Sequence, residues 1–204
     1  IPSVPTPALA NGHITFGCQN AFPKWNEPIV SLWANVLKAV PGSRLVVQAD
    51  PGPQQQRLAA WLGKSGVAPS SVSCVPQSTR LNYLQTFQQF DLALDTFPYC
   101  GNETTLDAFW MGVPVLSLCG KDALSRTGLS FAANLGLAEA LVVTSPQQFV
   151  ERAVQLTSDL SGLNNLRQQI LPRLQRSPLM QHDSFATNLE NAYRQMWLKW
   201  CQQG

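Results

Sequence analysis

Long apolar runs, clusters of basic residues and metal-binding spacings are all missing from this 204-residue sequence. No apolar stretch approaches the ~20 residues that a membrane-spanning helix needs, so we expect no membrane contact. Only 13% of the residues are charged, and the 14 Lys and Arg residues are scattered along a chain of net charge +2. Because nucleic-acid-binding proteins gather basic residues on one face, we expect no nucleic-acid partner.

The five cysteines do not have the number or the spacing of a disulfide framework or a zinc site. Their number is odd, and no Cys-x-x-Cys pair or paired-histidine spacing occurs. Reduced thiols are typical of cytoplasmic proteins, so a cytoplasmic location is expected. The two histidines, His13 and His182, are predicted to be structural rather than catalytic.

The first twelve residues, IPSVPTPALANG, have no basic n-region and no apolar h-region, so we do not expect them to be a signal peptide. They are rich in proline and lack a starting Met, which indicates a linker within a longer chain. We therefore predict a linker over residues 1–12 and a folded lobe over residues 13–204.

Apolar segments alternate with amphipathic segments up to residue 144. The predicted strands are residues 13–17, 44–48, 72–75, 90–96, 113–118 and 140–143. The predicted helices between them are residues 26–42, 53–66, 79–89, 104–112 and 122–135. After residue 144 only helical patterns occur, so residues 145–204 are predicted to be a helical C-terminal segment.

This alternation, with strands that are apolar on both faces, predicts an α/β fold with a Rossmann-like, doubly wound parallel sheet. Such sheets bind ligands at the carboxyl ends of their strands, where helix N-termini point. The loops that follow the predicted strands are therefore the first places to look for a site.

The segment LDTFPYCGNETTLDAF passes from one predicted strand into a helix. Thr104 and Thr105 fall in the first turn of that helix, where hydroxyls and free N–H groups can face a phosphate. Asp107 is placed to accept hydrogen bonds from a ribose diol. The same residue types also cap helices routinely, so the local spacing leaves both interpretations open.

Three further residues lie in carboxyl-edge positions. Lys24 follows the first predicted strand and can neutralise a diphosphate, although a solvated surface lysine has the same local pattern. Arg80 and Tyr83 begin the helix of residues 79–89 and could hydrogen-bond and stack on a base. A tyrosine at helical spacing is also common in a core.

Together these segments resemble a known family. The run FDLALDTFPYCGNETTLDAFWMGVPVLSLCG and the later SPLMQHDSFATNLENAYRQMW are similar to the C-terminal catalytic half of the O-linked N-acetylglucosamine transferase family, most closely its bacterial SPINDLY-type members. The resemblance covers residues 16–197 and implies the C-terminal lobe of a two-lobed GT-B glycosyltransferase. It further implies transfer of N-acetylglucosamine from UDP-GlcNAc to Ser or Thr of proteins, with inversion and without a metal.

The resemblance also implies a role for each candidate. Lys24 would bind the diphosphate and stabilise its charge as it leaves, which makes it the candidate catalytic residue. Arg80 and Tyr83 would contact the uracil. Asp107 would hold the ribose hydroxyls. The phosphate loop would consist of Glu103, Thr104 and Thr105.

One position departs from the family pattern. Family members usually carry Gly-Gly-Thr-Thr-Thr or Gly-His-Thr-Thr in this loop, whereas this chain has Gly-Asn-Glu-Thr-Thr. The carboxylate of Glu103 beside a diphosphate would repel it unless the side chain points away or caps the helix. The alternative is therefore a non-catalytic nucleotide-binding or assembly module that has lost transferase activity. The acceptor groove and the TPR repeats of the family lie outside this chain, so we expect the 204 residues alone to bind nucleotide without turnover.

Overall fold

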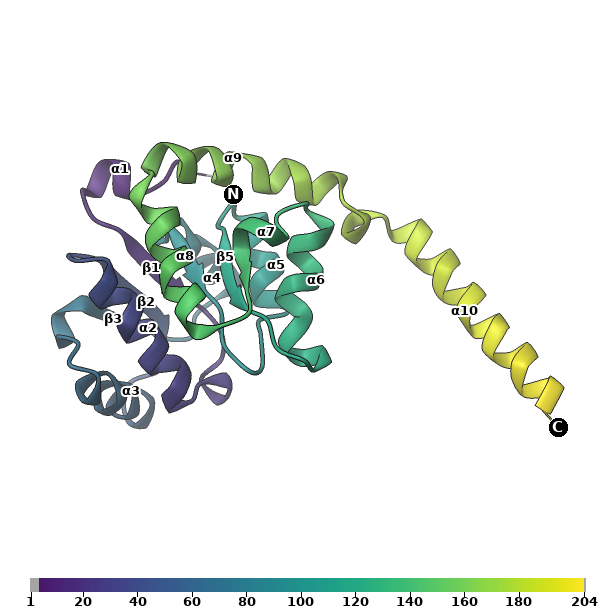
Figure 1. The fold of residues 1–204 in the computed structure, drawn as a ribbon, viewed down its shortest axis with the longest axis horizontal. Helices are drawn as coiled ribbons and strands as arrows, with labels where there is room; N and C mark the ends of the chain where they lie inside the picture. Colours follow the sequence, from purple (N-terminus) through teal and green to yellow (C-terminus); the bar gives the residue numbers. More distant parts are fainter. Residues whose placement is uncertain (1–3, 204) are drawn as a thin grey trace.

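Six parallel strands form one sheet in the order β3-β2-β1-β4-β5-β6 in the computed structural model, which describes residues 4–203 (Figure 1). The strands are β1 (Thr15–Cys18), β2 (Arg44–Gln48), β3 (Val72–Val75), β4 (Leu92–Leu94), β5 (Val115–Leu118) and β6 (Val142–Val143). This order is that of a Rossmann-like fold, so the predicted doubly wound parallel sheet is confirmed.

Ten α-helices are present in the described residues. They are α1 (Ala8–Asn11), α2 (Glu27–Ala39), α3 (Pro53–Lys64), α4 (Arg80–Thr86), α5 (Glu103–Trp110), α6 (Thr127–Asn134), α7 (Ala138–Leu141), α8 (Pro146–Ser158), α9 (Leu160–Arg176) and α10 (His182–Gln203). The strand predicted at residues 140–143 is shorter than expected, because the N–H groups of Ala140 and Leu141 donate to Leu137 O and close a helical turn.

Helices cover both faces of the sheet. Leu92 and Leu94 of β4 belong to one buried apolar cluster, together with residues of α2, α3 and α8. Ala93, between them, belongs to a second cluster with residues of α5, α6 and α9. Because successive side chains of a strand point to opposite faces, the two clusters lie on opposite sides of the sheet. These two layers explain why the central strands are apolar throughout.

Part of the segment predicted as a linker, residues 1–12, is packed against the folded lobe in the structure. Residues 1–3 lie outside the described residues, but Thr6 and Ala8 are buried and residues 8–11 form α1. The N–H of Ala8 donates to Asp91 Oδ1 across 2.8 Å, so this segment is attached to the amino end of β4. The proline-rich composition of this segment gives no sign of the contact with Asp91, which lies 83 residues further along the chain.

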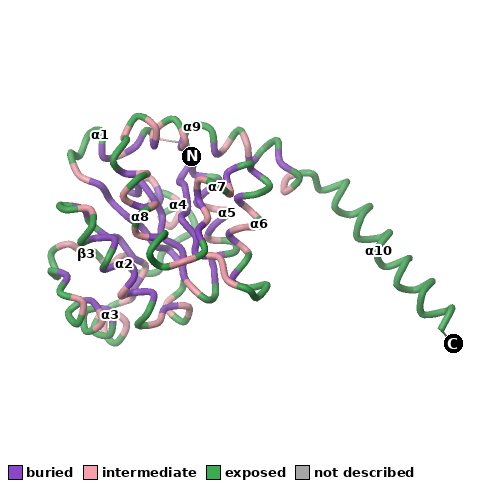
Figure 2. The backbone as a smooth tube through the Cα atoms, viewed as in Figure 1, coloured by how far each residue is buried: buried purple, intermediate pink, exposed green. Residues whose placement is uncertain are grey.

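The last helix, α10, leaves the body of the fold and carries no buried residue (Figures 1 and 2). The large apolar side chains that it exposes are Phe185, Leu189, Tyr193, Met196, Trp197, Leu198 and Trp200. The helix falls within the segment of residues 145–204 that was predicted to be helical, and its large apolar side chains are exposed in the described chain.

The switch point of the sheet lies between β1 and β4, which are neighbours. The connection from β1 leads to β2 on one side, and the connection from β4 leads to β5 on the other. The loops that follow these two strands therefore diverge and leave a crevice at their carboxyl ends, where doubly wound folds bind their ligands.

Candidate functional site

The buried carboxylate of Asp95 joins the two loops at the switch point. Its Oδ1 accepts hydrogen bonds from the backbone N–H groups of Thr96 at 2.8 Å and Gly101 at 2.7 Å, and from the Asn20 amide at 3.3 Å. Its Oδ2 accepts from the Ser117 hydroxyl at 2.7 Å. One side chain thus fixes the turn before α5 against the loop that follows β1.

Opposing effects act on the charge of Asp95. Burial raises the pKa of the Asp95 carboxyl above its usual value, while the hydrogen bonds from Gly101, Ser117 and Thr96 and the charge of Lys24 lower it. All four partners donate an N–H or O–H to the Asp95 carboxylate, and none accepts a hydrogen bond from it. This arrangement suits the ionised form of the carboxylate, which can only accept.

Lys24 follows β1 in a short 3₁₀ turn, residues Phe22–Lys24. Its Nζ donates to Cys100 O across 3.0 Å and lies 4.2 Å from the centre of the Tyr99 ring. The ammonium group is therefore held beside the turn that leads to Gly101. It does not line the cavity that contains most of the other candidates.

That cavity has a volume of about 330 Å³ and opens at the carboxyl edge of the sheet. Its lining residues are Gln48, Gln77, Ser78, Arg80, Tyr83, Glu103, Thr104 and Asp107. Five of the seven predicted site residues are among them, although they come from two helices far apart in sequence. The N-terminus of α5 begins at Glu103, so the unpaired N–H groups of its first turn lie at this cavity.

Arg80 and Asp107 form a bidentate ion pair across the cavity. The distances are 2.6 Å from Nη1 to Oδ2 and 2.5 Å from Nη2 to Oδ1. The Arg80 guanidinium also lies 5.2 Å from the centre of the Tyr83 ring. The hydrogen bonds to Asp107 raise the pKa of Arg80 above its usual value, so the guanidinium stays protonated throughout the physiological range.

Tyr83 is half-buried, and its backbone carbonyl accepts from Gln19 Nε2 at 3.2 Å. Burial raises the pKa of the Tyr83 hydroxyl, and the negative charge of Asp107 raises it further. The ring is thus a neutral aromatic surface at neutral pH, positioned by the loop that follows β1. Such a ring can stack on a planar base.

Thr105 differs from its predicted role as a phosphate-facing hydroxyl. It is 2% exposed, and its Oγ1 has no hydrogen-bond partner in the described part of the chain. A Cβ added at Gly101 would lie 2.4 Å from this oxygen, so the threonine fills the space beneath the turn. Successive residues of a helix point in different directions, so Thr104 faces the cavity and Thr105 faces the core.

Three lining residues were not predicted from the sequence. Gln48 ends β2, and Gln77 and Ser78 follow β3, so all three stand at carboxyl ends of strands. The strand-end rule that led to Arg80 applies equally to them. Asp95 lies within the predicted strand of residues 90–96, and no local pattern marks it as a site residue, because its partners lie up to 75 residues away.

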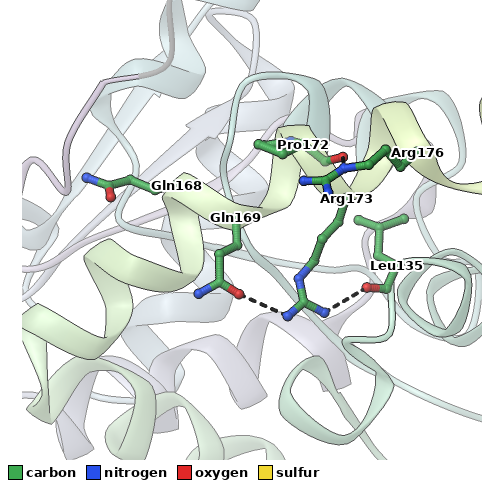
Figure 3. A pocket seen from close by; sticks show the side chains of 6 residues that line it. All are labelled: Leu135, Gln168, Gln169, Pro172, Arg173 and Arg176. Atoms are coloured by element: carbon green, nitrogen blue, oxygen red, sulfur yellow. Dashed lines mark hydrogen bonds between the residues drawn. The ribbon is translucent and has the colours of Figure 1, made fainter.

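A second cavity, of about 560 Å³, lies between α9 and the turn after α6 (Figure 3). There Arg173 donates to Leu135 O at 3.1 Å and to Gln169 Oε1 at 2.9 Å. Because Leu135 closes the end of α6, Arg173 serves to cap that helix and attach it to α9.

Within residues 4–203 no group of three or more His, Cys, Asp or Glu side chains is arranged to hold a metal ion. Over the same residues, no helix is long and apolar enough to cross a membrane.

Residues 5–189 match the family model described as glycosyl transferase family 41. The chain belongs to this family. The match covers both sides of the switch point, so Lys24, Asp95 and the cavity at α5 all lie within the family 41 region.

Two plant proteins and one solved bacterial structure are similar to this family 41 chain. The proteins named probable UDP-N-acetylglucosamine–peptide N-acetylglucosaminyltransferase SPINDLY from Solanum lycopersicum and Arabidopsis thaliana are each 37% identical, over 98% of this chain and 22% of their own length. The structure of an O-GlcNAc transferase mutant, K341M, from Thermobaculum terrenum superposes with a TM-score of 0.88 at 35% identity.

The match to the bacterial structure covers 100% of this chain and 38% of the other. The fold is therefore that of one lobe of a GT-B glycosyltransferase. The chain spans about a fifth of the length of the plant relatives that it matches.

Proposed function

We propose that this chain is the UDP-sugar-binding lobe of a protein O-glycosyltransferase, which transfers N-acetylglucosamine from UDP-GlcNAc to Ser or Thr of proteins. The observation that carries the proposal is the cavity at the N-terminus of α5, where Tyr83, Thr104 and Asp107 lie together. An aromatic ring, a helix N-terminus and a carboxylate suit a base, a phosphate and a ribose diol in turn. The family 41 match supports the same chemistry.

In the proposed reaction the acceptor hydroxyl oxygen attacks the anomeric carbon from the side opposite UDP. A bond to the acceptor oxygen forms while the bond from the anomeric carbon to the diphosphate oxygen breaks, so the centre inverts. Negative charge grows on the departing diphosphate, and the Lys24 ammonium together with the N-terminus of α5 would stabilise it. That lysine and helix terminus make a metal unnecessary in this scheme. The acceptor proton would pass to a group outside this chain.

The rest of the proposed enzyme supplies the acceptor side. The protein or peptide acceptor would bind through a second lobe, and the exposed apolar face of α10 would pack against that lobe. TPR repeats in the full-length protein and a cytoplasmic location complete the proposal.

The experiment that tests the proposal is UDP binding to the purified protein, measured by calorimetry or ligand-observed NMR. Wild-type protein should bind UDP, and Lys24→Ala and Asp107→Ala should each weaken binding about tenfold or more, as loss of a charge-assisted contact does. Lys38→Ala is the matched control. Lys38 is an exposed lysine in the last turn of α2, whereas Lys24 lies just before the first turn of that helix. Equal affinity in all four proteins would contradict the proposed site.

Glu103 supports a second candidate, a nucleotide-binding module without transfer activity. Its carboxylate lines the cavity beside the proposed diphosphate position, where a negative charge opposes binding. Transfer of radiolabelled N-acetylglucosamine to peptide by the full-length protein distinguishes the two. UDP binding without transfer, in wild type and in Glu103→Thr, would favour the module.

A further inference from the structure

Arg80 occupies two groups that a nucleoside would use. Both carboxylate oxygens of Asp107 accept from its guanidinium, at 2.6 and 2.5 Å. The same guanidinium lies over the Tyr83 ring, 5.2 Å from its centre. In the structure, therefore, the carboxylate proposed for the ribose and the ring proposed for the base are both already engaged by one side chain.

A nucleoside must displace Arg80 from at least one of these groups. The side chain of Arg80 is 64% exposed, whereas that of Asp107 is 14% exposed. Arg80 can thus move through solvent without disturbing the core, and Asp107 cannot. The arginine is the mobile member of the pair.

Glu103 offers the displaced guanidinium another partner. It stands four residues before Asp107 on α5, and side chains at this spacing lie on the same face of a helix. Both carboxylates line the cavity, and the side-chain carboxylate of Glu103 makes no ion pair or hydrogen bond within residues 4–203. The attraction of the Glu103 carboxylate also raises the pKa of Arg80, by less than the hydrogen bonds to Asp107 do.

We propose that Arg80 blocks the nucleoside site by pairing with Asp107 and moves to Glu103 when a nucleoside diphosphate binds. This inference rests on the proposed function and deepens it. In the occupied state Asp107 is free for the ribose, and the Tyr83 ring is free for the base. The guanidinium then lies between Glu103 and the diphosphate and neutralises the carboxylate that would otherwise repel the ligand.

The exchange also explains how a glutamate can stand in a phosphate-binding turn. Glu103 opposes a diphosphate only while it is unpaired. With Arg80 beside it, the local charge is balanced, and the guanidinium gains the phosphate as a further anionic partner. Arg80 is thus a specificity-determining residue that favours a nucleoside diphosphate over a nucleoside.

Removal of the Arg80 side chain should change the affinities for uridine and for UDP in opposite directions. Arg80→Ala should bind uridine about three- to fivefold more tightly than wild type, since an exposed ion pair worth at most ~1 kcal/mol no longer needs to break. The same variant should bind UDP about tenfold more weakly, because Glu103 is left unpaired beside the diphosphate. Arg80→Ala/Glu103→Gln should return UDP affinity to within about threefold of wild type.

The experiment is calorimetric titration of the purified wild-type, Arg80→Ala, Glu103→Gln and double-variant proteins with uridine and with UDP. Arg57→Ala is the matched control, because the Arg57 guanidinium also lies over an aromatic ring, that of Trp61, at 5.9 Å on α3. It should change neither affinity. Thermal unfolding of each variant checks that the fold is retained.

Two results would contradict the proposed movement of Arg80 from Asp107 to Glu103 while leaving the proposed function intact. If Arg80→Ala weakens uridine and UDP by the same factor, Arg80 is an ordinary ligand contact. If the effects of Arg80→Ala and Glu103→Gln on UDP affinity simply add, Arg80 has no second position at Glu103. If wild-type protein binds neither ligand, the proposed function itself is wrong, and the exchange is wrong with it.

Discussion

The backbone N–H of Gly101 donates to Asp95 Oδ1 across 2.7 Å, six residues back along the chain. This hydrogen bond closes the turn that leads from β4 into α5. Asp95 is buried at the switch point and also accepts from the Ser117 hydroxyl. The position of the α5 N-terminus, and hence of the candidate site, therefore depends on one buried carboxylate.

Replacement of Asp95 by Ala should lower the free energy of unfolding by about 3 kcal/mol or more, because it leaves several buried donors without an acceptor. UDP binding should weaken as well, since the turn at Gly101 is no longer fixed. Denaturant unfolding and UDP titration measure the two effects. Ser117→Ala, which removes one donor and keeps the carboxylate, should cost only about 1 kcal/mol. Equal losses in the two variants would show that Asp95 does not organise the turn.

Gly101→Ala should destabilise the protein by about 1–3 kcal/mol, the usual range for overpacking. The new Cβ would lie 2.4 Å from Thr105 Oγ1 and 3.2 Å from the Asn20 amide. Because the main clash is with one side-chain atom, Thr105→Ala in the same protein should recover much of the loss. A double-mutant cycle on unfolding free energies tests this, and strictly additive losses would contradict the proposed clash.

The parts of the fold that could be predicted depend on local pattern. The apolar strands β1, β2, β4 and β5 and the Asn26-capped helix α2 were found from short stretches of sequence. Their alternation then led to the doubly wound parallel sheet through general rules for parallel sheets. The carboxyl-edge rule, applied to strand ends, also led to Arg80 and Asp107 before their positions were known.

The parts that could not be predicted depend on contacts between distant residues. Nothing near Asp95 in the sequence indicates its bond to Asn20, and nothing near Arg80 indicates its pairing with Asp107, 27 residues later. For the same reason the segment of residues 1–12 was interpreted as a linker, since its anchor at Asp91 lies far along the chain. Long-range polar contacts leave no periodic signal in a single sequence.

Stability should fall steeply in alkaline solution because of buried thiols. Burial raises the pKa of Cys18 from 9.0 to about 12. The folded state therefore holds the proton that the unfolded state releases, so this contribution is complete below pH ~9 and is lost as the pH rises toward 12. Each pH unit in that window removes about 1.4 kcal/mol per thiol.

Between pH 9 and pH 10.5 the free energy of unfolding should fall in both wild type and Cys18→Ala. The fall should be about 2 kcal/mol smaller in Cys18→Ala, which lacks the buried thiol. Urea unfolding at both pH values measures the difference. Cys201→Ala is the control, because Cys201 is exposed on α10 and should follow the wild-type curve. Identical pH slopes in wild type and Cys18→Ala would mean that the thiol also ionises freely in the folded state.

Arg167 provides a test of whether stability and binding can be separated. It is 1% exposed on α9, and its Nη1 donates to Phe90 O at 2.6 Å and to Asp91 O at 3.2 Å. These carbonyls precede β4, at the amino edge of the sheet, whereas the candidate site lies at the carboxyl edge. Burial lowers the pKa of Arg167 to about 10, and the charge of Asp91 opposes that shift.

Arg167→Met should therefore lower the free energy of unfolding by about 3 kcal/mol, since two buried carbonyls and the Asp91 carboxylate lose a charged partner. UDP affinity per folded molecule should stay within about twofold of wild type, because the switch-point loops are untouched. Arg173→Met, which removes a half-buried guanidinium from the same helix, should cost only about 1 kcal/mol. If UDP affinity instead falls in step with stability for Arg167→Met, the amino edge transmits its packing through β4 to the turn at Asp95, and the two edges form one cooperative unit.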